Sequence, residues 1–167
     1  MTERSSLKLL FLSRHNAARS PMAECLMNAI GADRYTAFSA GVEPAGAVHP
    51  YAIELLSKNK LPVDKLRSKD WQRFAAPALL ELDFVISLCD LPPEAINANW
   101  PGRPILAHWE HADPCVREGD EAEIRRAFFN TYNQLFRRLT ILGSLPLEKL
   151  ERADLKRRID EIGDKGG

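Results

Sequence analysis

Cysteine is scarce in this chain, and its three cysteines, Cys25, Cys89 and Cys115, lie far apart in the sequence. An odd number of cysteines without a CxxC motif argues against a disulfide framework. Free thiols of this kind are typical of a reducing compartment. We therefore expect a cytoplasmic protein.

Excess charge and long apolar runs are also lacking. Lysine and arginine together number 23, as do aspartate and glutamate, so the formal net charge is zero. This balance gives no support for binding to nucleic acid or to a membrane surface through bulk charge. No apolar run is long enough to span a bilayer, and the short polar start, residues 1–6, does not resemble a secretory signal.

The apolar positions predict alternating strands and helices. A length of 167 residues and a hydrophobic content of 45% suit one globular domain, which we expect to cover residues 1–167. Strands are expected at 7–12, 35–39, 82–88 and 104–107; helices are expected from Ser20 to Gly31, at 50–59, after Ser68, after Pro92, at 121–142 and at 153–162. Such alternation predicts right-handed βαβ units, and hence an α/β fold with a parallel sheet and helices on both faces.

Ligands of parallel α/β sheets bind beyond the carboxyl ends of the strands. The loop after residues 7–12 should lie at this edge, together with Cys89 and Asp113, which follow two later strands. The loop runs from Ser13 to Arg19, with five residues between these ends. With cysteine in first place, this spacing would be a CxxxxxR phosphate loop.

The chemistry of such a loop depends on three kinds of group. Backbone N–H groups bind the oxygens of a tetrahedral anion, and the N-terminus of the following helix adds partial positive charge. Arg19 can hold two of the oxygens in its planar fork. An acid on the opposite side can protonate a leaving oxygen, and Asp113 is the candidate.

Several short motifs occur in a characteristic order along the chain. They are Phe11-Leu12, Asn16-Ala17-Ala18-Arg19-Ser20, Met22-Ala23-Glu24, Ser39-Ala40-Gly41, Arg67-Ser68-Lys69, Leu88-Cys89-Asp90, Trp100-Pro101-Gly102 and His108-Trp109 leading to Asp113-Pro114. With these motifs the chain resembles the low-molecular-weight protein tyrosine phosphatase superfamily, and most closely its bacterial arsenate reductase branch. The resemblance covers nearly the whole chain. It implies a flavodoxin-like three-layer sandwich with a four-stranded parallel sheet.

The resemblance also implies roles for matching residues. Position 13 would be the nucleophile, Arg19 the anion clamp, and Asp113 the general acid, while Ser20 would hydrogen-bond the nucleophile. The amide cradle would consist of Arg14, His15, Asn16, Ala17 and Ala18. Cys89 matches the second cysteine of the reductase relay. The third relay cysteine would lie shortly before Trp100, where this chain has Asn97-Ala98-Asn99. Neither a cofactor nor a metal ion is implied.

The chain departs from the family at the nucleophile. Ser13 has no thiolate and cannot form a disulfide, and an alcohol without a general base is a poor nucleophile. We therefore expect little or no turnover. Binding of phosphate, arsenate or sulfate does not need the thiol and is still expected.

Three hypotheses follow for Ser13. The natural protein could carry cysteine there, with serine introduced to trap an anion; the chain would then be a tyrosine phosphatase or an arsenate reductase, the latter served by thioredoxin or a small thiol. Alternatively, Ser13 is native and the protein binds an oxyanion or a phosphorylated partner without turnover. In the third hypothesis the loop is vestigial, and the protein has a regulatory or interaction role.

Some side chains invite other interpretations. His15 could act as a base toward Ser13, but two residues of one tight loop need not face each other. Cys89 could be a buried small hydrophobe. Four residues, His108, His111, Asp113 and Cys115, suit zinc by type, but their spacing is not standard and a metal would compete with an acid role for Asp113. We therefore expect no metal site among them.

Overall fold

The computed structural model describes residues 6–165. Most of the polar start, on which the argument against a secretory signal depends, lies outside the described residues. The strands are β1 (Leu7–Ser13), β2 (Tyr35–Gly41), β3 (Phe84–Ser87) and β4 (Ile105–His108); the helices are α1 (Arg19–Ile30), α2 (Pro50–Lys58), α3 (Pro93–Ile96), α4 (Glu121–Ser144) and α5 (Arg152–Lys165). Three single 3₁₀ turns are η1 (Trp71–Arg73), η2 (Pro114–Val116) and η3 (Leu147–Lys149).

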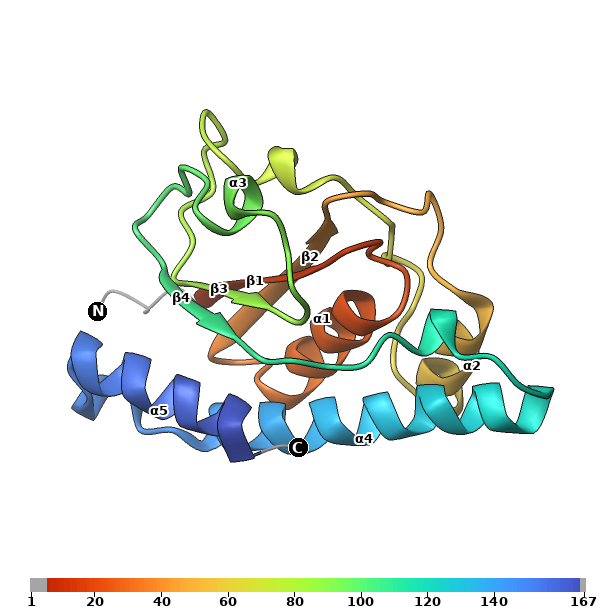
Figure 1. The fold of residues 1–167 in the computed structure, drawn as a ribbon. Helices are drawn as coiled ribbons and strands as arrows, with labels where there is room; N and C mark the ends of the chain where they lie inside the picture. Colours follow the sequence, from red (N-terminus) through yellow and green to blue (C-terminus); the bar gives the residue numbers. More distant parts are fainter. Residues whose placement is uncertain (1–5, 166–167) are drawn as a thin grey trace.

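The four strands form one parallel sheet in the order β2-β1-β3-β4 (Figure 1). Strand β1 lies in the interior of the sheet, and its residues Leu9 to Leu12 are fully buried. An apolar run is typical of such a strand, because helices or loops cover it on both faces. The predicted α/β fold and its four-stranded parallel sheet are confirmed.

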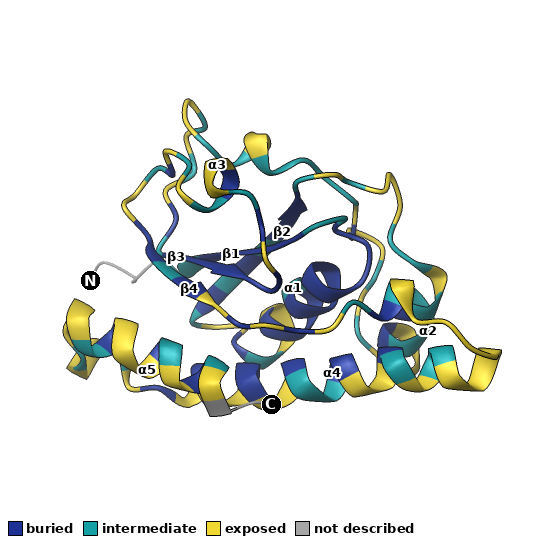
Figure 2. Ribbon diagram, viewed as in Figure 1, coloured by how far each residue is buried: buried dark blue, intermediate teal, exposed yellow. Residues whose placement is uncertain are grey.

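The two faces of the sheet are covered unequally. On one face, Leu9 and Phe11 pack into a core with residues of α1, α4 and α5, which lie below the sheet in Figure 1. On the other face, Leu10 and Leu12 pack against a smaller cluster that includes Trp100. Short elements, α3 and η1, and the loops between them cover this second face, and yellow exposed segments are frequent there (Figure 2). The long helices thus lie on one side of the sheet.

Two predicted helix starts are wrong by one or two residues. Helix α1 begins at Arg19 and has no side-chain cap, because the Ser20 hydroxyl is hydrogen-bonded to Ser13. Turn η1 is capped by Asp70, which accepts from the Gln72 N–H, whereas the Ser68 hydroxyl donates to the loop carbonyl of His15. In both places a tertiary contact uses the serine that local propensity assigns to a cap.

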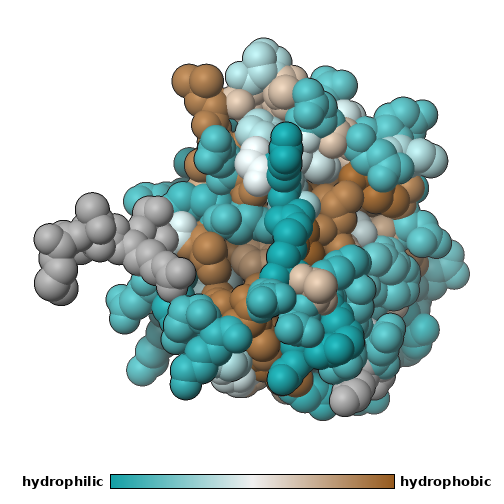
Figure 3. All heavy atoms as spheres, turned by 90° about the vertical axis from the view of Figure 1, so that its left-hand side faces the viewer, coloured by the Kyte–Doolittle hydropathy of each residue, from teal (hydrophilic) through white to brown (hydrophobic). Residues whose placement is uncertain are grey.

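A cavity of about 720 Å³ lies at the amino edge of the sheet, opposite the edge where ligands are expected. The first residues of β1, β3 and β4 contribute to its walls, together with Leu147 and Leu155 from the C-terminal part. Apolar atoms show between polar side chains on this face of the molecule (Figure 3).

Among residues 6–165, no helix is long and apolar enough to cross a membrane.

Candidate functional site

The carboxyl edge of the sheet brings together the loops predicted to lie there. Strand β1 ends at Ser13 and leads through the loop to Arg19, the first residue of α1. The chain after β4 returns to this loop, because the Arg19 guanidinium lies 3.3 Å from the Asp113 carboxylate. Arg19 and Asp113, predicted as clamp and acid, are therefore neighbours, although 93 residues separate them in sequence.

The carbonyl groups and the amides of the loop backbone differ in their hydrogen-bond partners. The carbonyl groups point outward: Arg14 O, His15 O and Ala17 O accept hydrogen bonds from the amides of residues 43, 45 and 49, at 2.8, 3.0 and 2.8 Å. The amides of residues 15–18, by contrast, donate to no protein acceptor within residues 6–165. Successive backbone amides without a protein partner are the donors that anion-binding nests use.

Asn16 fixes the shape of the loop from inside. Its φ of 47° is a left-handed conformation, which asparagine tolerates better than most residues. The Asn16 side chain is fully buried; its Nδ2 donates to Ser20 Oγ at 2.7 Å, and its Oδ1 accepts from the Lys69 amide at 2.8 Å. Gly41 permits this arrangement, because a Cβ there would lie 2.9 Å from both Arg14 O and Asn16 N.

Ser13 lies at the base of the loop and is 1% exposed. Its Oγ lies 2.6 Å from Ser20 Oγ. Because Ser20 Oγ already accepts from Asn16, the Ser20 hydroxyl can donate its own hydrogen to Ser13. The Ser13 hydroxyl then keeps its own hydrogen available for donation, and no protein base within the described residues contacts it.

Arg19 is held from two sides. Its Nη1 donates to the His111 carbonyl at 3.1 Å, and its Nη2 contacts Asp113 Oδ2 at 3.3 Å. The other Asp113 oxygen accepts from the Cys115 amide at 3.0 Å, so both oxygens of this carboxylate have a partner. A buried arginine with this geometry is oriented before any ligand arrives.

The carbonyl that holds Arg19 depends on a buried pair of basic side chains. His111 Nδ1 lies 2.8 Å from the Trp109 carbonyl, and Arg138 Nη1 from α4 lies 3.0 Å from His111 Nε2. Burial and the nearby Arg138 charge lower the pKa of His111 to about 4. The ring is therefore neutral, with its Nε2 lone pair accepting from Arg138.

A second support lies beneath the loop. Glu24 of α1 contacts Lys69 at 3.6 Å and accepts from the Ser39 hydroxyl at 2.7 Å. Burial raises the pKa of Glu24 and lowers that of Lys69, and the mutual attraction of the two charges opposes both shifts. The pair ties α1, β2 and the segment before η1 to each other, and the Lys69 amide in turn holds Asn16.

Arg14 and His15 lie at the mouth of the loop. Arg14 contacts Glu43 at 3.4 Å and donates to the Asp90 carbonyl at 3.3 Å. His15 Nδ1 lies 2.9 Å from the Glu43 carbonyl. The structure therefore turns the His15 ring toward Glu43, and the Ser13 hydroxyl is paired with Ser20, so these contacts give no support to His15 as the base for Ser13.

The three cysteines have different surroundings. Cys89 is buried, and burial raises the pKa of its thiol; Arg19 and the backbone N–H of Arg14 act in the opposite direction. Burial and the Asp113 carboxylate raise the pKa of the Cys115 thiol to about 12. Cys25 belongs to the core and donates to the Pro62 carbonyl at 3.2 Å. None of these thiols is activated as a thiolate at neutral pH.

The four residues considered for zinc do not form a ligand cluster within the described part of the chain. Instead, His111 is hydrogen-bonded to Arg138, and Asp113 forms an ion pair with Arg19. The group that His108 does join consists of Asp90 and Glu110.

Sequence patterns did not reveal Arg138, Glu24 or Lys69 as supports of the site. For Arg138 a signal exists, because it lies three residues after Leu135 and four before Leu142, on the edge of the apolar stripe of α4. A charged residue at such a position is expected to be paired inside the protein. Glu24 and Lys69 each belong to one of the short family motifs, but no local pattern shows that these two distant segments pair.

This geometry agrees with the comparisons with known proteins. Residues 8–152 match the family described as "Low molecular weight phosphotyrosine protein phosphatase". The chain belongs to this family. A glutaredoxin arsenate reductase of Synechocystis sp. (strain ATCC 27184 / PCC 6803 / Kazusa) is 32% identical over 123 residues, which are 71% of this chain and 85% of that protein. An arsenate reductase of Bacillus cereus (strain G9842) is 29% identical over 113 residues, 68% of this chain and 81% of that protein.

Solved structures give the same result. An arsenate reductase in its phosphate-binding state superimposes with a TM-score of 0.65 and 27% identity, covering 83% of this chain and 97% of that one. An arsenate reductase from Archaeoglobus fulgidus DSM 4304 gives a TM-score of 0.57 at 27% identity, over 78% and 98% of the two chains. Within its family the chain is thus similar to the arsenate reductase branch, as the sequence motifs predicted.

Proposed function

We propose that the loop from Ser13 to Arg19 binds a tetrahedral oxyanion, phosphate or arsenate, without turning it over by a thiol mechanism. The observation that carries this proposal concerns the backbone of the loop. Its carbonyl groups accept hydrogen bonds from the amides of residues 43, 45 and 49, whereas the amides of residues 15–18 have no protein partner in the described part of the chain. These amides are strong donors that need an acceptor. A phosphate or arsenate oxygen supplies one.

The buried Arg19 supports a preference for a dianion. Its guanidinium already lies beside the loop in a fixed orientation, and the N-terminus of α1 adds partial positive charge. Asp113 is the counter-charge of Arg19 in the free protein. Anion binding therefore competes with Asp113 for the same guanidinium.

The absence of turnover rests on Ser13. Its hydroxyl contacts Ser20 and no base, so nothing removes its proton. The similar proteins named as arsenate reductases suggest arsenate as a ligand, but thiol-based reduction needs a cysteine at position 13. We accordingly expect neither thioredoxin nor a small thiol to drive arsenate reduction by this chain.

Calorimetry with phosphate and arsenate tests the proposal. We expect saturable binding of one anion per chain, and a loss of at least about 50-fold in affinity for Arg19→Ala, in line with removal of a charge-assisted bidentate contact. Arg126→Ala, which removes an exposed arginine on α4, is the matched control and should bind normally. Absence of binding, or equal binding by Arg19→Ala and the control, would contradict the proposal and favour a vestigial loop.

A further inference from the structure

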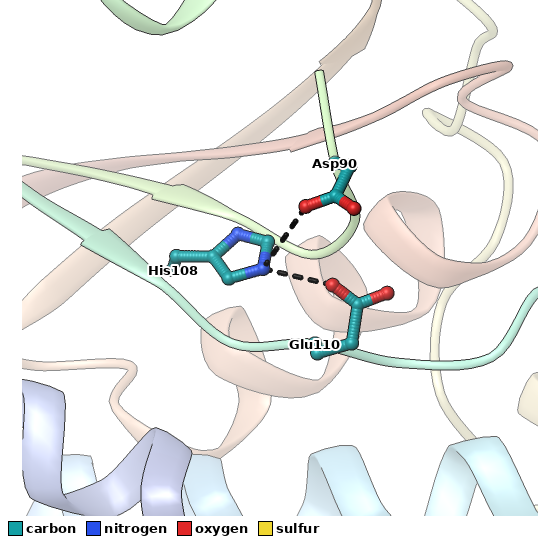
Figure 4. Close-up of side chains that lie close together, drawn as sticks. All are labelled: Asp90, His108 and Glu110. Carbon is teal, nitrogen blue, oxygen red and sulfur yellow. Dashed lines mark hydrogen bonds and ion pairs between the residues drawn. The ribbon is translucent and has the colours of Figure 1, made fainter.

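A second group of polar side chains lies at the same edge of the sheet, outside the loop. Asp90 follows β3, His108 is the last residue of β4, and Glu110 follows two residues later. Their side chains point toward one another (Figure 4). One ligand atom from each lies within 4.8 Å of the other two. His108 Nε2 lies 2.8 Å from Glu110 Oε2 and 3.9 Å from Asp90 Oδ1.

The orientation of the His108 ring is fixed by a contact to Nδ1, the ring nitrogen that does not face the carboxylates. Its Nδ1 lies 2.8 Å from the hydroxyl of Ser87, the last residue of β3, and Ser87 Oγ also contacts the Ala107 carbonyl at 3.4 Å. The serine can therefore accept the Nδ1 hydrogen while donating its own to the carbonyl. Without a cation, the 2.8 Å contact with Glu110 requires a hydrogen on Nε2. When the ring carries its hydrogen on Nδ1 instead, the Nε2 lone pair is available to a cation held between the two carboxylates. A partner on the other ring nitrogen is the usual arrangement behind a metal-binding histidine.

The cluster has an excess of negative charge. Within residues 6–165, His108 is the only side chain that contacts the carboxylates of Asp90 and Glu110 by hydrogen bond or ion pair. The nearby Arg14 does not neutralise them, because its guanidinium binds the Asp90 carbonyl and Glu43. Two carboxylates thus share one imidazole, which can supply at most one positive charge. A divalent cation would balance the cluster.

We propose that Asp90, His108 and Glu110 bind a divalent transition-metal cation. One imidazole nitrogen and two carboxylate oxygens are a ligand set typical of cations such as Zn²⁺, Mn²⁺, Co²⁺ and Fe²⁺. The imidazole favours these over Mg²⁺ and Ca²⁺, which prefer oxygen ligands. Three protein ligands leave positions open for water or for a ligand atom. The high exposure of the three side chains makes this a weak, exchangeable site.

This site does not include the residues considered for zinc from sequence, apart from His108. The ring nitrogens of His111 face Trp109 and Arg138, and the Asp113 carboxylate is paired with Arg19. The cation site is also separate in its ligands from the anion loop, since no residue between Ser13 and Arg19 belongs to it. The two proposals can therefore fail independently.

Titration of the tag-free protein with Co²⁺ tests the site, with the signal read from calorimetry and from paramagnetic broadening of the histidine ring resonances. We expect one Co²⁺ per chain and selective broadening of His108 among the four histidines. His108→Gln and Glu110→Gln should each weaken binding at least tenfold, and Ser87→Ala about tenfold, because a metal ligand loses its supporting hydrogen bond.

Asp154→Asn is the matched control, because it removes an exposed carboxylate whose one ionic partner within residues 6–165 is Arg157, at 3.1 Å. It should bind Co²⁺ as the unmodified protein does, and so should Arg19→Ala, in which the anion loop is impaired. Circular dichroism of each variant checks that it is folded. If Co²⁺ does not bind saturably, or if His108→Gln binds it as well as the control does, His108 and Glu110 form only a surface ion pair and the proposal is overturned.

Discussion

The guanidinium of Arg19 lies 3.3 Å from the carboxylate of Asp113, and both side chains are largely buried. The first belongs to the start of α1 and the second to the segment after β4, so this contact closes the candidate site across the carboxyl edge of the sheet. In the free protein the Asp113 carboxylate is paired with the Arg19 guanidinium, which is the group that a bound anion would contact.

Removal of the Asp113 charge should therefore strengthen anion binding. We expect Asp113→Asn to bind phosphate about tenfold more tightly, a gain of about 1.4 kcal/mol, because Arg19 loses its competing partner and the anion loses a like-charged neighbour. Calorimetry over a range of salt concentrations measures it, with Asp154→Asn as the control. An unchanged or weaker affinity would show that Asp113 does not compete for Arg19.

A thiol at position 13 should restore chemistry. In Ser13→Cys the loop amides and Arg19 should lower the pKa of the new thiol below its usual value and yield a thiolate. We expect this variant to hydrolyse an aryl phosphate, whereas the unmodified protein does not. Adding Asp113→Asn should lower kcat by about 10²-fold, the scale of a lost general acid.

The two outcomes of that experiment have different meanings. If Ser13→Cys binds phosphate and yet is inactive, the result counts against Asp113 as the general acid. If it is active and Asp113→Asn leaves kcat unchanged, another group protonates the leaving oxygen.

Asn16 should affect both stability and binding. Asn16→Ala removes two buried side-chain hydrogen bonds, to Ser20 and from Lys69, and places alanine at a φ of 47°. We expect the free energy of unfolding in urea to fall by about 2–4 kcal/mol. Phosphate affinity should fall as well, because the loop loses its internal support.

Asn28→Ala provides the comparison, since the Asn28 side chain also makes two hydrogen bonds: its Nδ2 donates to the Ala37 carbonyl and its Oδ1 accepts from the Ala37 amide. It should lower stability while phosphate affinity is retained. Equal losses of affinity in the two variants would mean that the effect of Asn16 is only global destabilisation.

His111 should make stability depend on pH. In the unfolded chain its imidazole binds a proton near pH 6.5, whereas in the folded protein its pKa is about 4. The unfolded state therefore binds more protons between these values, and the free energy of unfolding should fall as the pH drops from 7 to 4, by about 3 kcal/mol from this residue. His111→Gln should lack that part of the pH dependence. Identical slopes in urea unfolding for both proteins would contradict the neutral, buried imidazole.

The strands and helices could be predicted from the sequence because each depends on a local pattern of residues. The apolar run at residues 7–12 predicted a central strand, and Gly31 and Pro50 predicted a helix end and a helix start that the structure confirms. The motifs also predicted the family, which the comparisons confirm. The functional roles of Ser13, Arg19, Asp113 and Cys89 stay predictions.

Features that depend on distant contacts could not be predicted. Ser20 has the propensity of a helix cap, but its hydroxyl is used by Ser13 and Asn16. The support of Arg19 by His111 and Arg138 joins three segments far apart in sequence. No local pattern shows which way the carbonyl of His111 points.

A phosphate titration followed by amide NMR tests whether the loop from Ser13 to Arg19 is an oxyanion site. We expect saturable shifts of the amide resonances of residues 15–18, because those N–H groups donate to the bound anion, and loss of these shifts in Arg19→Ala. If these four amides do not respond to phosphate while the protein remains folded, the loop is not an oxyanion site.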